Sequence, residues 1–270
     1  MTNGALMRTV LFLFLNTVLL FSSELKLTQK QAEYIATKVW MNEGAGLDKY
    51  LVHWNEGEDF ASVGIGHFIW FSEGHTERFR EVFPMVLAFM EERNVTMPKW
   101  LNAKTPLPWN SKVEFYRAKQ TNSRKYRELF GFLKRTMPQQ AEFMAARLSH
   151  ALPEMLGTIE EEHKKQLIRR RFNRMLYHAE GSIDERGLYI LIDYTNFKGE
   201  GTLESERYNG EGWGLLQVLE YFDENASDKY KAFADAAKAM LGRRIKNSPP
   251  ARGEERWRKG WNVRLDTYWK

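Results

Sequence analysis

The chain has 270 residues, a formal net charge of +5 from 40 basic and 35 acidic side chains, and no cysteine. The lack of cysteine excludes disulfide bonds and a lipid anchor on cysteine. The nine tryptophans could stack on sugar rings, although tryptophan more often fills a hydrophobic core. The small positive charge is compatible with an anionic polymer as partner but does not by itself indicate one.

Residues 1–23 have the pattern of a secretory signal peptide. Arg8 precedes an apolar run over residues 10–21, and two serines follow that run. The run is too short to span a membrane comfortably, so we expect it to be removed on export, leaving residues 24–270 without a membrane span. A retained N-terminal anchor is the alternative. Export without disulfides favours the bacterial periplasm or secretion.

The most informative stretch opens with a predicted helix that carries a glutamate near its end. Thr28 and Gln31 have the spacing of a capping box, which starts the helix, and Gly44 is expected to end it. Glu43 would then lie at the negative end of the helix dipole, where partial burial would raise its pKa. Such a carboxyl group could act as a general acid near neutral pH.

Two aromatic and β-branched runs follow, over residues 50–54 and 60–66, and predict a β-hairpin. Its turn contains three acidic residues, Glu56, Glu58 and Asp59. Glycosidases of the two-carboxylate type need a protonated acid on one side of the scissile bond and a second carboxylate on the other. The turn could supply that second group, although acidic turns are also common on solvated surfaces.

Taken together, Glu43-Gly44, the acidic turn and Ser62-Val63-Gly64-Ile65-Gly66-His67 resemble the active-site signature of phage-type lysozymes. In that family Glu-Gly is followed by an acidic turn and Thr-Ile-Gly-Ile-Gly-His. The resemblance covers roughly 25 residues and implies that Glu43 is the acid and that Ser62 positions the attacking water.

The resemblance leaves the second carboxylate open. The family's spacing points to Glu56, but this chain has about four extra residues in the segment and lacks the family's Asp. Glu58 and Asp59 therefore remain alternatives. His67 is a candidate for substrate binding, and the alternative is that it is simply a packed histidine after a tight glycine turn.

A second stretch begins with a buried element, expected to be a helix, over residues 188–192. It leads into Asp193, Tyr194 and Asn196, which precede a glycine-rich loop. This cluster is similar to a segment of lysozyme-superfamily hydrolases that presents polar residues to the sugar, so the resemblance implies substrate-binding roles. The alternative is a structural loop followed by a capped helix.

The rest of the chain is predicted to be mainly helical. A helix is interrupted by or starts at Pro84, a charged helical insertion covers about residues 112–180, and an alanine-rich helix covers residues 225–241. The arginine run at residues 169–171 is better explained by a solvated helix face than by nucleic-acid binding. Arg264 resembles an arginine of a late helix in lysozyme-like hydrolases that packs against the catalytic helix. It could support the surroundings of Glu43, but we expect it instead to form a surface ion pair.

The sequence therefore predicts a mainly α (α+β) fold, lysozyme-like, with two lobes around a cleft and a small β-hairpin. We expect a monomeric, exported glycoside hydrolase that cleaves β-1,4 bonds in peptidoglycan without a metal or cofactor, since His53, His67 and His75 lack a zinc-site pattern. A chitosanase or chitinase-like hydrolase is one alternative, favoured if the subsites are acidic. A non-catalytic wall-glycan-binding protein is the other, because the family's Asp is missing.

Overall fold

The computed structural model describes residues 25–75 and 80–270, so the expected signal peptide lies outside the described residues. The described chain is mainly helical with a small antiparallel sheet, which confirms the predicted α+β class. The α-helices are α1 (Gln29–Gly44), α2 (Phe83–Glu92), α3 (Lys112–Gln120), α4 (Arg124–Arg135), α5 (Met137–Gly157), α6 (Glu162–Leu176), α7 (Glu185–Lys198), α8 (Leu215–Tyr221), α9 (Lys229–Asn247) and α10 (Arg258–Asp266). The strands are β1 (Val52–His53), β2 (Ala61–Val63), β3 (Phe68–Trp70), β4 (Arg207–Tyr208) and β5 (Glu211–Gly212).

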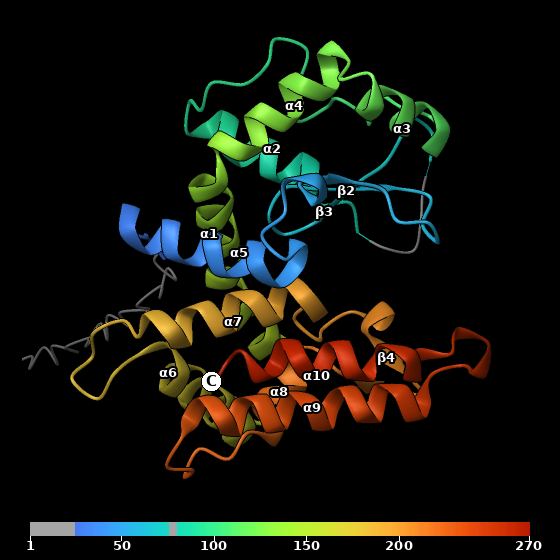
Figure 1. Cartoon of the computed structure of the whole chain (residues 1–270). Coiled ribbons are helices and arrows are strands. Elements are labelled where there is room, and N and C mark those ends of the chain that lie inside the picture. The colour runs from blue at the N-terminus through green and yellow to red at the C-terminus, as the bar shows by residue number, and fades with distance from the viewer. Residues whose placement is uncertain (1–24, 76–79) are drawn as a thin grey trace, which may run out of the picture.

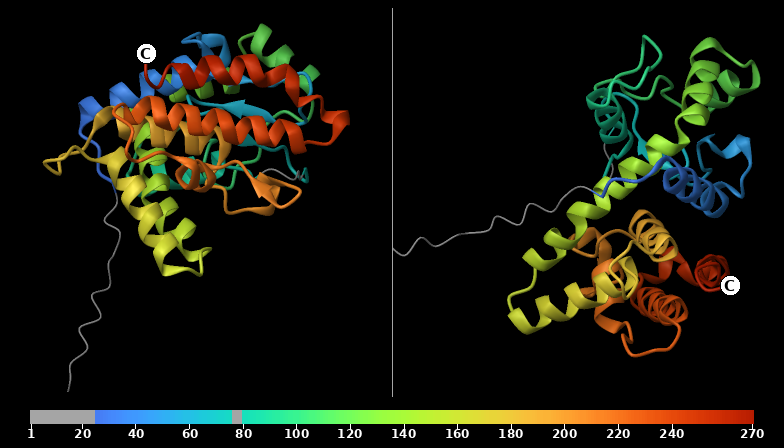
Figure 2. Two further views of the ribbon diagram at one scale, coloured as in Figure 1. Left: turned by 90° about the horizontal axis from the view of Figure 1, so that it is seen from below. Right: turned by 90° about the vertical axis from the view of Figure 1, so that its left-hand side faces the viewer.

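The long helix α5 connects two groups of elements. One group contains the sheet β1–β3 with α2, α3 and α4, and the other contains α6 to α10 (Figure 1). Figure 2 shows α5 running from the first group to the second, with α1 packed along it. The predicted helical insertion thus contains the helix that joins the two groups. None of the helices in residues 25–75 and 80–270 has the length and apolarity needed to cross a membrane.

Helix α1 begins as predicted and ends one residue later than predicted. The Thr28 hydroxyl accepts a hydrogen bond from the Gln31 N–H, and the Gln31 side chain accepts one from the Thr28 N–H, which completes the capping box. Gly44 remains helical, and Ala45 takes the left-handed conformation at φ 50° and donates its N–H to the Trp40 carbonyl. This cap leaves Glu43 within the last turn of the helix.

The predicted hairpin is confirmed, but it belongs to a sheet of three strands in the order β1-β2-β3. The tight turn between β2 and β3 explains the additional strand. Gly64 has φ +75°, and a Cβ there would lie 2.4 Å from Oε1 of Gln140, so glycine is required. The same Gln140 oxygen accepts the N–H of Ile65 at 2.8 Å, which fastens the turn to α5.

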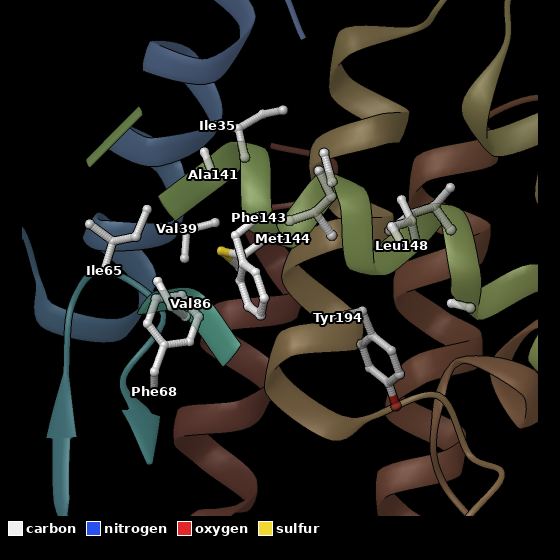
Figure 3. Close-up of a cluster of buried hydrophobic side chains, with 14 of the residues drawn as sticks. Ile35, Val39, Ile65, Phe68, Val86, Ala141, Phe143, Met144, Leu148 and Tyr194 are labelled. Carbon is white, nitrogen blue, oxygen red and sulfur yellow. The ribbon is translucent and has the colours of Figure 1, made fainter. Parts of the chain in front are cut away.

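The main core lies where α1, α2, α5 and the sheet meet. Figure 3 shows that the apolar side chains of these elements point towards one another. Phe68 of β3 packs edge-on against Phe143 of α5, with 5.7 Å between ring centroids. Fully buried members include Ile35, Val39, Ile65, Val86 and Ala141. This packing fixes the end of α1 against the turn that follows β2.

Helix α7 confirms the buried helix expected at residues 188–192. Every residue from Gly187 to Thr195 is buried, because α1, α5, α6 and α8 all pack against this helix. Other predictions also hold in outline: Pro84 lies in the first turn of α2, and the alanine-rich helix is α9, which begins at Lys229 rather than at residue 225.

Glu254 is the centre of a buried ion-pair cluster near the end of the second group. Its carboxylate accepts hydrogen bonds from Arg244 at 2.7 and 2.9 Å, from Arg252 at 2.9 Å and from the Tyr208 hydroxyl at 2.9 Å. Burial would raise the pKa of Glu254, but the hydrogen bonds and charges of the two arginines lower it to about 2. The cluster ties β4 to α9 and to the segment before α10.

Replacing this carboxylate should change the acid stability of the fold. Because the folded-state pKa of Glu254 is below its ordinary value, its stabilising effect is present above about pH 4.5 and is lost as the pH falls towards about 2. We expect Glu254→Gln to lower the free energy of unfolding at neutral pH and to flatten its decline over this range. Urea unfolding followed by circular dichroism at several pH values measures this, with the exposed Glu204→Gln as control. If the free energy of unfolding of Glu254→Gln fell as steeply with decreasing pH as that of the parent, the proposed role of Glu254 would be contradicted.

Candidate active site

Glu43 lies where α1, the turn after β2, α7 and α10 converge, and 15% of its side chain is exposed. Nη2 of Arg264 donates a hydrogen bond to Oε1 of Glu43 at 2.8 Å, and Nδ2 of Asn196 approaches the same oxygen at 3.3 Å. On the other side, Nδ1 of His67 lies 3.8 Å from Oε2. The carboxylate therefore has one oxygen held by two donors and one oxygen that faces only an imidazole.

The pKa of Glu43 is lowered, which is the opposite of the sequence-based expectation. Burial raises it, as expected, but attraction to Arg264 and His67, the hydrogen bond from Arg264 and the charge of Lys198 together outweigh burial. The prediction was wrong because it considered only the helix dipole and desolvation, whereas the deciding charges come from other elements. In the unliganded protein Glu43 is a carboxylate at neutral pH.

Asp193 accepts hydrogen bonds from Arg264, the same arginine that donates to Glu43. Its carboxylate has no exposed surface and accepts hydrogen bonds from Arg264 at 2.8 and 3.0 Å, from the Tyr268 hydroxyl at 2.6 Å and from Asn42 at 3.2 Å. Arg264 is itself buried, with 8% of its side chain exposed, so the expected surface ion pair is wrong and the alternative, support of the surroundings of Glu43, is confirmed. The arginine is instead shared between two carboxylates, a geometry that suits the planar guanidinium.

His67 is oriented by the backbone of the segment before β1. It has a left-handed conformation with φ 47°, and its Nε2 lies 3.1 Å from the Tyr50 carbonyl oxygen. A carbonyl can only accept, so Nε2 carries hydrogen in this arrangement. In the neutral ring, the lone pair of Nδ1 then faces Oε2 of Glu43.

The second predicted cluster is divided between the interior and the site. Asn196 donates to Glu43 and, at 3.0 Å, to the carbonyl of Gly66, so it links α7 to the turn after β2. Tyr194 is fully buried and its hydroxyl donates to the Trp213 carbonyl at 2.7 Å. Asp193 is equally buried. The expected substrate contacts of Asp193 and Tyr194 are therefore wrong, because both side chains point away from the surface.

On the hairpin, Ser62 is buried and pairs across the ladder with His53. The ring of His53 lies 2.9 Å from Oδ1 of Asn55, and Nδ2 of Asn55 donates to Glu58 at 2.7 Å. Burial lowers the pKa of His53, despite its hydrogen bond with Asn55. Polar contacts thus connect His53, which lies opposite Ser62, through Asn55 to the carboxylate of Glu58.

The other two acids of the turn are exposed. Asp59 and Glu56 lie on the surface, and the backbone carbonyl of Glu56 accepts a hydrogen bond from Lys112. No hydrogen bond or ion pair among the described residues joins a turn carboxylate to Glu43. The identity of the second carboxylate therefore stays a prediction.

Several residues of the site carried no sequence signal that we used. Tyr268 follows Arg264 by one helical turn, and Lys198 follows Asn196 on α7.

Cavities of about 880 and 940 Å³ elsewhere in the described chain, against α5, do not include Glu43 or its partners. In the described residues no group of three or more His, Asp or Glu side chains could hold a metal ion. The chemistry around the carboxylate, rather than cavity size, selects this site.

The chain was also compared with known proteins. No protein-family model, curated protein or solved structure matches it.

Removing the shared arginine should destabilise the fold. Arg264→Met leaves Asp193 buried without its cation, which we expect to cost about 3–5 kcal/mol in the free energy of unfolding. The double variant Asp193→Asn/Arg264→Met should recover part of that loss, because it also removes the uncompensated charge. Urea unfolding measures both. The matched control is Arg258→Met, which breaks an exposed ion pair with Glu255 and should change little. If Arg264→Met and Arg258→Met lowered the free energy of unfolding equally, a buried arginine shared by two carboxylates would be contradicted.

Proposed function

We propose that this protein is an exported glycoside hydrolase that cleaves β-1,4 bonds in peptidoglycan, with Glu43 as the general acid. The observation that carries the proposal is the convergence of Arg264, Asn196 and His67 on one barely exposed glutamate in the last turn of α1. That glutamate heads the segment with the Gly-Ile-Gly-His pattern. A carboxyl group held in this way is typical of an acid–base residue rather than of a surface charge.

In this proposal, the fold is a lysozyme-like arrangement of two lobes around a cleft. The lobes are the sheet-containing group and the group of α6 to α10, and the cleft lies along the line where they meet at Glu43. Asn196 supports this placement because it lies on α7, in one group, and bonds the carbonyl of Gly66, in the turn after β2 of the other group.

The two oxygens of Glu43 would have different roles. Oε1 is occupied by Arg264 and Asn196, so the proton of the acid form sits on Oε2, which faces Nδ1 of His67. Oε2 would give this proton to the glycosidic oxygen as the bond breaks. A bound glycan that excludes the remaining water disfavours the carboxylate and so favours the protonated form. Glu56, or Glu58 or Asp59 in the same turn, would help water attack, with Ser62 orienting it.

The lowered pKa of Glu43 also supports a second candidate, a glycan-binding protein without catalysis. A permanently ionised Glu43 could accept hydrogen bonds from sugar hydroxyls but could not donate a proton. A chitosan-cleaving enzyme stays an alternative, because Arg264 is already paired with both Glu43 and Asp193 and so does not by itself repel a cationic polymer.

Exchange of Glu43 tests the hydrolase. Glu43→Gln keeps the shape and removes the proton donor, so the release of reducing ends from purified peptidoglycan should fall by roughly 10²–10⁴-fold. Because only the protonated acid is active, the rate of the parent should rise as the pH falls below neutrality. The control is Glu33→Gln, an exposed glutamate on the same helix. An inactive parent that is folded and retained on peptidoglycan would overturn the hydrolase and favour the binding protein.

The turn carboxylates can be separated in the same assay. We expect Glu56→Gln to lower kcat with little change in KM, because a group that activates water acts mainly in the transition state. Glu58→Gln and Asp59→Asn should retain most of the activity. A large loss in Glu58→Gln with none in Glu56→Gln would move the role to the residue bonded to Asn55.

A further inference from the structure

Lys198, the last residue of α7, places its amino group beside the candidate site. Its Nζ lies 3.8 Å from the ring centroid of Phe197 and 3.8 Å from that of Trp261 on α10. In residues 25–75 and 80–270 this ammonium makes no hydrogen bond or ion pair, and its side chain is partly buried. Contact with two aromatic faces stabilises a cation but leaves its hydrogens unsatisfied.

The carboxylates nearest to Lys198 are already engaged by arginines. Glu43 bonds Arg264 at 2.8 Å, and Glu254 bonds Arg244 at 2.7 and 2.9 Å. Burial lowers the pKa of Lys198 well below its ordinary value, and repulsion by Arg244 and Arg264 lowers it further. Electrostatic attraction to an arriving anion would offset both effects, so the surroundings favour a negatively charged ligand at this position.

The rings around Lys198 extend the feature into an aromatic platform. Trp261 and Trp257 are both partly buried, with ring centroids 5.8 Å apart and planes tilted by 36°. Phe197 contacts both basic side chains, because the guanidinium carbon of Arg264 lies 4.0 Å and Nζ of Lys198 lies 3.8 Å from its ring centroid. Partly exposed rings of this kind can stack on the apolar face of a sugar.

The position is adjacent to the reacting centre. Asn196, which contacts Glu43, and Lys198 lie on the same final turn of α7, and Arg264 contacts both Glu43 and the ring of Phe197. A ligand group bound by Lys198 would therefore belong to a sugar unit next to the glycosidic oxygen that Glu43 protonates.

We propose that Lys198, Phe197 and Trp261 form a subsite for a sugar unit that carries a carboxylate, next to the bond cleaved at Glu43. The cleavage in this inference rests on the proposed hydrolase, whereas the binding of an anion is argued from the contacts of Lys198 alone. In peptidoglycan the carboxylate has two sources, the lactyl group of a muramic acid that has lost its peptide and the stem peptide.

Hydrolysis of matched substrates tests the subsite. We compare glycan strands with free carboxylates and the same strands converted to methylamides. The parent should favour the free strands by about tenfold in kcat/KM, mainly through KM. Lys198→Met keeps the apolar length of the side chain and should remove that preference, while Lys231→Met, which breaks an exposed ion pair with Asp235 on α9, should keep it. A preference that persists in Lys198→Met would overturn the proposal.

The source of the carboxylate and the hydrolase itself are tested separately. Strands stripped of peptides by an amidase carry the lactyl carboxylate, and peptide-bearing strands carry only peptide carboxylates, so the strand that shows the Lys198-dependent preference identifies the source. Calorimetric titration with the disaccharide N-acetylglucosaminyl-N-acetylmuramic acid and with its methylamide needs no catalysis. Tighter binding of the acid by the parent alone would support the subsite even if hydrolysis fails. Equal binding of both by a protein that does hydrolyse the strands would overturn the subsite and retain the hydrolase.

Discussion

The site depends on one buried arginine that is shared by two carboxylates. Asp193 has no access to water, so its charge is tolerable only because Arg264, Tyr268 and Asn42 all donate to it. The same guanidinium extends to Glu43 and sets both its position and its ionisation. Helices α1, α7 and α10 are thereby joined at one point, and the direction of the Glu43 pKa follows from that junction rather than from the helix on which Glu43 lies.

Local patterns predicted much of the fold. The capping box of α1, the hairpin, the glycine turn before His67 and the buried helix α7 each depend on neighbours within a few residues, and each is present. The burial of Arg264 could not be predicted in this way, because Glu43 lies 221 residues away in the chain. The sign of the Glu43 pKa shift was missed for the same reason: the opposing charges belong to distant elements.

Helical geometry explains which residues of the second cluster reach the site. The sequence places Asp193, Tyr194 and Asn196 almost side by side, which suggested one shared role. In α7, however, successive residues turn around the axis, and neighbouring helices enclose the stretch from Gly187 to Thr195 but not the final residues of the helix. The first two side chains are therefore directed inward, and only the end of the helix, at Asn196 and Lys198, contributes to the surface near Glu43.

The distance along the chain between Glu43 and Arg264 has a consequence for the order of assembly. A contact that closes a loop of this length carries an entropic cost, so we expect it to form after the local helices and the hairpin. An incompletely folded or proteolytically shortened molecule would carry the glutamate without the cation that orients it. The site would then be complete only in fully folded molecules, because Arg264 reaches Glu43 only when α10 is packed against α7.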